Sequence, residues 1–372
     1  MAHPSQPPRR LRRLLVRAAV RAGFTLIELM IAVVIGAFVV SALYALFVGQ
    51  MRQFMYQDLQ MEMHQNMRLG MDILTRTVRM AGYGTGSPDG AYTDGVFGDG
   101  GDNNAALSSI ISYDGTGPNG ADAITVVSMD PALVFDTYET SPPPCGSTSL
   151  TVVPSVNDQQ SKLEQLSNGE LLLCVDYAGI GHFTSYLWSM DGAPDAANGV
   201  VSIASGSTYA DFETACPSTS NLPMIMTCSR AEVATFYIDA NDSDGVGSGS
   251  ADHPVLMMDL DFQSPDDDDI PVVDNVEDFQ VAYCLKPAGA TTDCADGGPD
   301  WSDTIPAGSA KDVYMVRLSL VVRSSRPDLS GDYQGAPLSV ENNAPSATPD
   351  HYYRQLLTTR VAVRNLRLQA NL

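Results

Sequence analysis

Hydrophobic side chains dominate one continuous stretch near the N-terminus. From Phe24 to Val48 the chain is almost entirely apolar, and Glu28 is the only charged residue within it. A bilayer core of ~30 Å needs about 20 apolar residues in a helix, which rises about 1.5 Å per residue. Residues 24–49 are therefore predicted to form a membrane-spanning helix segment.

A second hydrophobic pattern follows directly, with apolar residues at steps of three or four. The stripe consists of Met51, Met55, Leu59, Met63, Met67, Met71, Leu74 and Val78. This spacing places one apolar face on a helix, so residues 50–81 are predicted to continue the first helix to about Met80 as an amphipathic segment. A face this rich in methionine favours packing against a sheet over a cofactor site.

Beyond the helix the pattern changes to short apolar runs separated by turn residues. The predicted strands lie at 122–127, 170–177, 232–238, 255–262, 316–323 and 355–368. In the run 316–323 the apolar positions Val316, Leu318, Leu320 and Val322 alternate with Arg317, Ser319 and Arg323. That alternation predicts a strand with one buried face and one exposed face.

These elements predict an α+β fold. A long N-terminal helix, whose first half is transmembrane and whose second half is amphipathic, packs on a mostly antiparallel β-sheet head at 82–372. Long loops rich in Gly, Pro, Asp and Ser are expected at 84–120, 136–148, 240–254 and 286–310. Such loops are where contacts with partners vary most.

The residues before the apolar stretch form a basic leader. Residues 1–23 hold six arginines and no acidic side chain. By the positive-inside rule this end stays in the cytoplasm, so the head is expected in the periplasm and the chain crosses the inner membrane once.

Glu28 is the most informative residue because a carboxylate in an apolar span costs on the order of 2.5–3.5 kcal/mol unless it is paired. Cleavage between Gly23 and Phe24 would create a charged α-amino group four residues before it, on the same helix face. The carboxylate could pair with its own amine or with that of a neighbouring subunit. Only the second arrangement builds a polymer.

The segment Gly23-Phe24-Thr25-Leu26-Ile27-Glu28, followed by its apolar run, resembles the class III signal of type IV pilins and of type II secretion pseudopilins. This resemblance implies removal of 1–23 by a prepilin peptidase and N-methylation of Phe24. It also implies that Glu28 sets the register of subunits during assembly.

The head resembles PilW-type minor pilins. The similar blocks begin at Arg68, Gly120, Val276, Val316 and Arg360, in that order along the chain. Cys284 departs from the family pattern, in which a glycine more usually follows the tyrosine. The resemblance implies a non-enzymatic subunit that acts in pilus priming and assembly at the tip and ends on the cell surface.

The same resemblance implies several partners. They are other minor pilins and the major pilin, contacted through the N-terminal helix, the prepilin peptidase and the inner-membrane assembly platform, with a tip adhesin as a further candidate. The alternatives are a type II secretion pseudopilin or, in another class, a membrane-tethered calcium-dependent adhesin or periplasmic enzyme.

Charge disfavours one class of partner for the head. The net charge is −23, and the only basic residues between 81 and 310 are Lys162, Arg230 and Lys286. So acidic a surface repels phosphate backbones, which makes nucleic acid an unlikely ligand.

Six cysteines lie in the exported part, at Cys145, Cys174, Cys216, Cys228, Cys284 and Cys294. An even number in an oxidising compartment indicates disulfides, although sequence alone allows 15 pairings. Short separations favour Cys216 with Cys228 and Cys284 with Cys294, which leaves Cys145 with Cys174.

Motifs for catalysis or cofactors are weak. A Gly-x-Gly-x-x-Gly match at Gly115, Gly117 and Gly120 lies between two strand-like runs, so it is predicted to be a turn that binds no phosphate. We expect no cofactor and no active site.

One acidic loop raises the question of calcium. Its candidate ligands are Asp239, Asn241, Asp242 and Asp244, and oxygen ligands of this kind suit the ion. The register of a calcium loop fails here, because Asp244 stands where the turn glycine belongs and Ser250 where the final glutamate belongs. The segment is either an Asx-turn loop or a calcium loop.

Overall fold

The fold comes from a computed structural model. It describes residues 24–85, 109–139, 149–152, 159–179, 182–203, 224–240, 253–260, 269–286, 294, 300–306, 309–328, 333–344 and 349–366. The chain divides into two compact units, Met1–Asp58 and Leu59–Leu372, which are described separately below.

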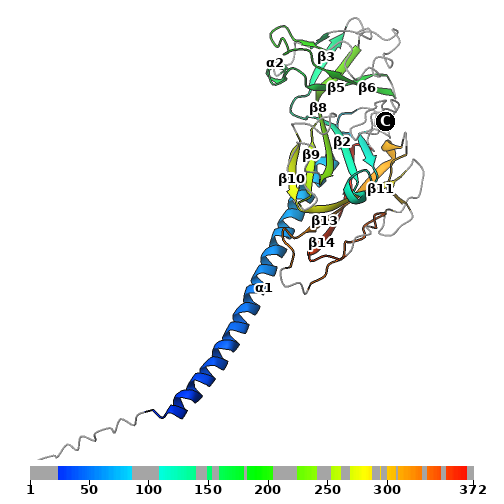
Figure 1. The fold of residues 1–372 in the computed structure, drawn as a ribbon. Coiled ribbons are helices and arrows are strands. Elements are labelled where there is room, and N and C mark those ends of the chain that lie inside the picture. Colours follow the sequence, from blue (N-terminus) through cyan, green and yellow to red (C-terminus); the bar gives the residue numbers. More distant parts are fainter. Residues whose placement is uncertain are drawn as a thin grey trace, which may run out of the picture. The chain divides into compact units, whose positions relative to one another are not determined.

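Helix α1 spans Leu26–Met80 without interruption and so contributes to both units (Figure 1). The predicted end at Met80 is confirmed, whereas the predicted start at Phe24 is two residues too early. Burial of the apolar stripe begins at Leu59, while Met51 and Met55 are exposed, contrary to the prediction that they belong to the packed face. The stripe packs only where the head surrounds it.

The end of α1 is set by glycine and by the C-terminal segment. Gly82 has a φ of +75°, which a residue with a side chain rarely adopts, and its N–H donates to the carbonyl oxygen of Val127 at 3.0 Å. Asn365 Nδ2 lies 3.3–3.4 Å from the carbonyl oxygens of Arg79, Met80 and Ala81. The amide of Asn365, together with the Tyr83 N–H that donates to the Met80 carbonyl at 2.8 Å, supplies donors to carbonyls at this end of the helix.

The head contains two main sheets, and every strand pairing within them is antiparallel, as predicted. The larger sheet holds β1 (Ile110–Tyr113), β2 (Ala123–Met129), β3 (Phe135–Glu139), β5 (Leu171–Gly179), β6 (His182–Ser189), β8 (Met224–Asp239), β9 (Val255–Asp259) and β10 (Ile270–Asp274). The smaller sheet runs in the order β12 (Trp301–Ser302), β11 (Val276–Leu285), β13 (Val313–Arg323) and β14 (Arg354–Ala362). Short elements complete the head: the pair β4 (Ser149–Thr151) and β7 (Val200–Ser202), helix α2 (Gln159–Leu163), and the 3₁₀ turns η1 (Pro118–Gly120) and η3 (Ala310–Asp312).

Strand β8 belongs to both halves of the larger sheet (Figure 1). Residues 224–230 pair with β3 and β5, and residues 231–239 pair with β2 and β9. The predicted strand at 232–238 is therefore only the second half of a longer one. Ser229 and Arg230 break the apolar pattern between the halves, which concealed the first half from sequence reasoning.

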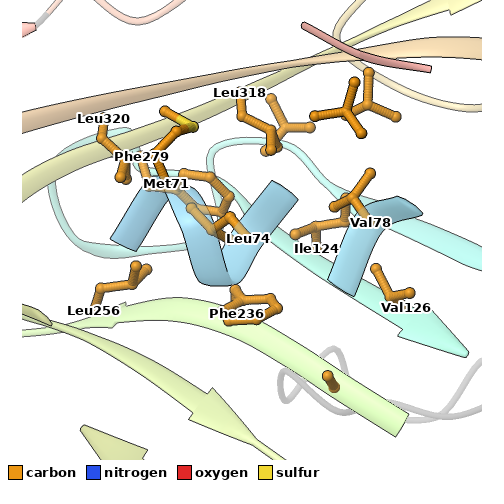
Figure 2. Packing of buried hydrophobic residues seen from close by; sticks show 14 of the residues in the cluster. Met71, Leu74, Val78, Ile124, Val126, Phe236, Leu256, Phe279, Leu318 and Leu320 are labelled. Atoms are coloured by element: carbon orange, nitrogen blue, oxygen red, sulfur yellow. The ribbon is translucent and has the colours of Figure 1, made fainter. Parts of the chain in front are cut away.

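The main core forms where α1 passes between the two sheets. Figure 2 shows Phe236 and Leu256 of the larger sheet on one side of the helix, and Leu318 and Leu320 of the smaller sheet on the other. Gly70 lies at the closest approach, because a Cβ there would be 3.1 Å from Val273 Cγ2 and 3.2 Å from Leu320 Cδ1. The buried face of the helix thus contacts both sheets, which accounts for its apolar stripe.

A second core lies at the other end of β8. Its members come from strands β2 to β8 and from helix α2 and include Phe135, Leu150, Leu163, Leu173, Val201 and Met226. Unlike the main core, it contains no residue of α1.

Two details of the smaller sheet differ from expectation. Ser319 and Arg323 are buried although they were predicted on an exposed face. Ser319 Oγ lies 3.0 Å from Thr358 Oγ1 on β14, and the guanidinium of Arg323 stacks 4.6 Å from the centre of the Tyr352 ring. The last strand ends at Ala362, not 368, because the chain then turns to bring Asn365 to the end of α1.

Candidate processing and assembly site

The start of α1 is organised by Thr25 and Glu28. The backbone N–H of Thr25 donates to Glu28 Oε2 at 3.0 Å, and the Thr25 hydroxyl donates to the same oxygen at 3.1 Å. In return the Glu28 N–H donates to Thr25 Oγ1 at 3.3 Å. This reciprocal pattern is a capping box, in which two helix-end N–H groups are satisfied by side chains.

The capping box fixes where the helix begins. Thr25 is the N-cap residue: its carbonyl oxygen accepts the first intrahelical bond, from Leu29 N–H at 3.2 Å. Phe24 precedes the helix and is 89% exposed. The sequence signal for this cap is the motif Thr-x-x-Glu at Thr25 and Glu28.

Of the predicted processing residues, Phe24 and Glu28 are described and Gly23 lies outside the described residues. The pairing of Glu28 with a Phe24 amine stays a prediction, because that amine exists only after cleavage. Glu28 also lies in the first turn of α1, where a negative charge is favoured by the helix dipole.

The surface of the first unit is apolar around its whole circumference. Large hydrophobic side chains from Leu26 to Phe47 are all more than half exposed. Among the described residues α1 is the one helix long and apolar enough to cross a bilayer. A helix that is hydrophobic on every side needs a lipid or protein environment, so this segment anchors the chain in the membrane.

Of the three predicted disulfides, one is confirmed and two are wrong. Cys284 pairs with Cys294, as predicted. Cys174 pairs with Cys228, so the predicted pairs Cys216 with Cys228 and Cys145 with Cys174 are wrong. Cys174 and Cys228 stand directly opposite each other on β5 and β8, a register that sequence separation does not reveal.

Of the four candidate calcium ligands, the structure describes Asp239. Asp239 ends β8 and is 7% exposed, whereas Asn241, Asp242 and Asp244 lie outside the described residues. Within the described ranges no three His, Cys, Asp or Glu side chains are grouped closely enough to hold a metal ion.

Asp122 is a buried carboxylate that sequence reasoning did not single out. Its two oxygens accept the N–H groups of Gly115 (2.9 Å) and Val281 (2.8 Å). Burial nevertheless raises the pKa of Asp122 to about 7. Its role is structural, because these bonds tie the glycine-rich turn at η1 to β11. The chain passes from η1 into β2 with no helix after it, which confirms the prediction of a turn at Gly115, Gly117 and Gly120.

Comparison with protein families gives two matches. Residues 235–365 match the family described as type IV pilus-assembly protein W, PilW. Residues 19–44 match the prokaryotic N-terminal methylation motif. No curated protein and no solved structure matches the chain.

The two matches agree with the geometry. The methylation motif covers the capping box and the apolar part of α1, and the PilW match covers the second half of β8 together with β9 to β14. Proteins of these families build or assemble pili and are structural. The chain therefore carries a PilW-like segment at 235–365 and a pilin-type methylation motif at 19–44, and α1 anchors it in the membrane.

Proposed function

We propose that this chain is a PilW-type minor pilin of a type IV pilus, which is cut between Gly23 and Phe24 by a prepilin peptidase at the cytoplasmic face and is then N-methylated at Phe24. The observation that carries this proposal is the position of Glu28, a carboxylate in the first turn of α1, whose large hydrophobic side chains from Leu26 to Phe47 are exposed. The arginine-rich leader supports a cytoplasmic N-terminus and a periplasmic head.

In the proposed assembly, Glu28 also sets the position of each subunit. The mature helix slides into a bundle of pilin helices, where the apolar surfaces supply affinity. The Glu28 carboxylate attracts the terminal amine of a neighbouring subunit and so fixes the axial register, because opposite charges attract strongly in a low dielectric. The partners on this route are the major pilin, other minor pilins and the assembly platform of the inner membrane.

We place the subunit at the pilus tip, in the complex that primes assembly. The support is the second core, which is built largely from residues before 235 and so adds bulk outside the PilW match. A uniform shaft repeats one subunit at close spacing, and a larger head fits better where the helical array ends. A tip adhesin is a further candidate partner for such a head.

Processing and assembly are tested with substitutions in the full-length chain. Gly23→Phe should leave the arginine-rich leader attached, as seen by mass spectrometry. Glu28→Gln should be processed normally and yet be absent from sheared surface fibres. Asp72→Asn serves as the matched control, because Asp72 is an exposed acid farther along the same helix. Normal processing of the first variant and normal piliation by the second would refute the proposal.

The tip position has its own test. An epitope tag in the head, visualised with gold-labelled antibody, should mark fibre ends. Labels spaced evenly along the fibres would show a shaft subunit instead.

A further inference from the structure

The smaller sheet ends on β14, a strand with a long outer edge. In the strand order β14, red in Figure 1, stands last, and among the described strands it pairs with β13 alone. The ladder between the two strands runs from Met315 and Ala362 to Arg323 and Arg354 without a register shift. The side chains of Leu356 and Ala362 are exposed. The strand therefore presents a regular edge to its surroundings.

One hydrogen bond establishes which backbone groups of β14 face outward. Just beyond the ladder, and in the same register, the Val363 N–H donates to the carbonyl oxygen of Tyr314 at 3.2 Å. Bonding alternates along an antiparallel pair, so residues with odd numbers in β14 direct their N–H and C=O groups toward β13. Residues with even numbers, among them Leu356, Thr358 and Ala362, direct theirs away from the sheet.

Three other edge strands of the head carry features that block the addition of a foreign strand. Strand β10 contains Pro271 and a register shift beside it, β1 has four residues, and β12 has two. Proline, bulges, charges and short length all keep an edge from pairing. Residues 355–359 of β14, Gln-Leu-Leu-Thr-Thr, include no charge and no proline. Strand β14 thus lacks the protection that these three edges have.

Charge narrows the kind of partner that this edge fits. From Arg354 to its end the chain holds four arginines and no acid, although the net charge of the whole is −23. The guanidinium of Arg354 is paired with Glu277 at 2.8 Å and with Asp350 at 2.6 Å. Positive charge therefore concentrates at the other end of the strand, at Arg360 and Arg364. A second copy of β14 would bring two arginine-rich strands together, whereas an acidic strand would be attracted.

We propose that the outer edge of β14 binds an extended acidic segment of another protein as an added strand. The outward N–H and C=O groups of Leu356, Thr358 and Ala362 supply the backbone bonds, and acidic side chains of the segment lie beside Arg360 and Arg364. The side chain of Leu356, which is 45% exposed, adds apolar contact. In such complexes backbone bonds give affinity, and side-chain contacts select the partner. This proposal stands whether or not Glu28 has its proposed role in assembly.

The test uses the full-length chain in detergent and a labelled synthetic peptide, Glu-Val-Glu-Val-Thr-Val-Thr. In an antiparallel arrangement its acidic end meets Arg360 and Arg364. Fluorescence anisotropy measures the dissociation constant. Glutamine in place of both glutamates should weaken binding about fivefold, because two cross-strand charge pairs are lost. Equal binding of the glutamine peptide would show that the partner need not be acidic and would overturn the proposal.

Two N-methylated versions of the peptide separate strand addition from simple charge attraction. One carries methyl groups on the amides of its odd positions, and the other on those of its even positions. A strand bonds to an edge through alternate residues, so one version should bind at least about tenfold more weakly while the other stays within about twofold of the unmodified peptide. Equal binding of the two versions, or no detectable binding of the unmodified peptide, would overturn the proposal.

Variants of the chain locate the binding site. Thr358→Pro removes an outward N–H and no bond to β13, and it should weaken binding about tenfold. Arg364→Glu, which reverses the charge of an exposed side chain and leaves the backbone unchanged, should weaken binding about fivefold. It decides the matter if thermal unfolding shows that Thr358→Pro does not fold. Arg68→Glu, at an exposed position on α1, changes the net charge equally and is the control.

Two further results would overturn the proposal. Equal weakening by Arg364→Glu and Arg68→Glu would show attraction to the overall charge of the chain without a site at β14. A dimer of the unchanged chain in light scattering that Thr358→Pro dissociates would identify a second copy as the occupant of this edge.

Discussion

Asp122 joins three segments of the head through its backbone and its side chain. Its N–H donates to the carbonyl oxygen of Phe279 at 2.8 Å, and its carboxylate accepts N–H groups from Gly115 and Val281. Burial outweighs these favourable bonds and raises its pKa from an ordinary value of 3.8 to about 7. A carboxylate placed in this way makes the stability of the head depend on pH.

The direction of that dependence follows from the two pKa values. Because the folded state binds this proton more tightly than the unfolded state does, the contribution of Asp122 is most favourable below about pH 4. This contribution to the free energy of unfolding is lost as the pH rises to about 7. Over the whole range it amounts to on the order of 4 kcal/mol. Asp122→Asn should therefore make the free energy of unfolding depend less on pH between pH 4 and 7. Urea unfolding of the full chain in detergent at pH 4, 5.5 and 7 measures this dependence.

The exposed control Asp72→Asn should keep the slope of the unchanged chain. Equal slopes for Asp122→Asn and Asp72→Asn would show that Asp122 is not the source of the dependence.

Gly82 combines a positive φ with a lack of space. A Cβ at this position would collide with the buried side chain of Leu366, whereas a Cβ at Gly169, which also has a positive φ, would meet nothing within 4 Å. Gly82→Ala should therefore cost about 2–4 kcal/mol, from backbone strain and overpacking together. Gly169→Ala should cost only about 1–2 kcal/mol, from the strain alone. Thermal unfolding of the two variants compares them, and equal losses would contradict the collision at Leu366.

At the scale of elements, α1 has two unlike faces within the head. The face turned to the sheets carries Met63, Met67, Leu74 and Val78, all of them buried. The opposite face carries exposed residues, among them Leu69, which is 52% exposed. Packing between two sheets, and not helix propensity, therefore accounts for most of the stability of this half of α1.

Two leucines on the same helix test this division. Leu74→Ala removes a fully buried side chain and should lower the free energy of unfolding by about 2–5 kcal/mol, because a cavity is left between the sheets. Leu69→Ala removes a similar volume from a half-exposed side chain and should cost less than about 1 kcal/mol. Chemical denaturation measures the free energy of unfolding of both variants. A large decrease for Leu69→Ala would mean that the helix face that carries Leu69 is covered.

Sequence patterns predicted the elements with strong periodicity and missed features that depend on distant contacts. Helix α1 followed from its stripe, and Glu28 followed from one charge in an apolar run. The register that sets Cys174 against Cys228 depends on how β5 meets β8, and no local pattern encodes it. The capping role of Thr25 was encoded locally, but a charge-based interpretation of Glu28 hid it. Burial of Ser319 and Arg323 depended on β14 and Tyr352, which are distant in sequence.

At the scale of the whole head, β8 connects two cores, and only the main core contains residues that the PilW model matches. The PilW match begins at residue 235, close to where β8 passes from partners β3 and β5 to partners β2 and β9. The main core around α1 draws on the matched residues, and the second core lies mostly before them. The second core therefore forms a lobe, built from residues 127–233, that is joined to the main core through the shared strand β8.

The two disulfides fall on opposite sides of this division. Cys174–Cys228 closes a segment of 54 residues within the lobe, and Cys284–Cys294 closes one of 10 residues beside β11. Chain entropy alone assigns about 4 kcal/mol to the first bond and about 3 kcal/mol to the second.

Replacing Cys174 and Cys228 together by serine should therefore open β5 and the first half of β8 while β13 stays protected, because the main core does not use that bond. Amide hydrogen exchange followed by mass spectrometry resolves the strands separately. The double variant in which serine replaces Cys284 and Cys294 is the control, and its loss of protection from exchange should be confined to the segment beside β11. Equal deprotection of β13 and β5 in the first variant would mean that the two cores unfold as one.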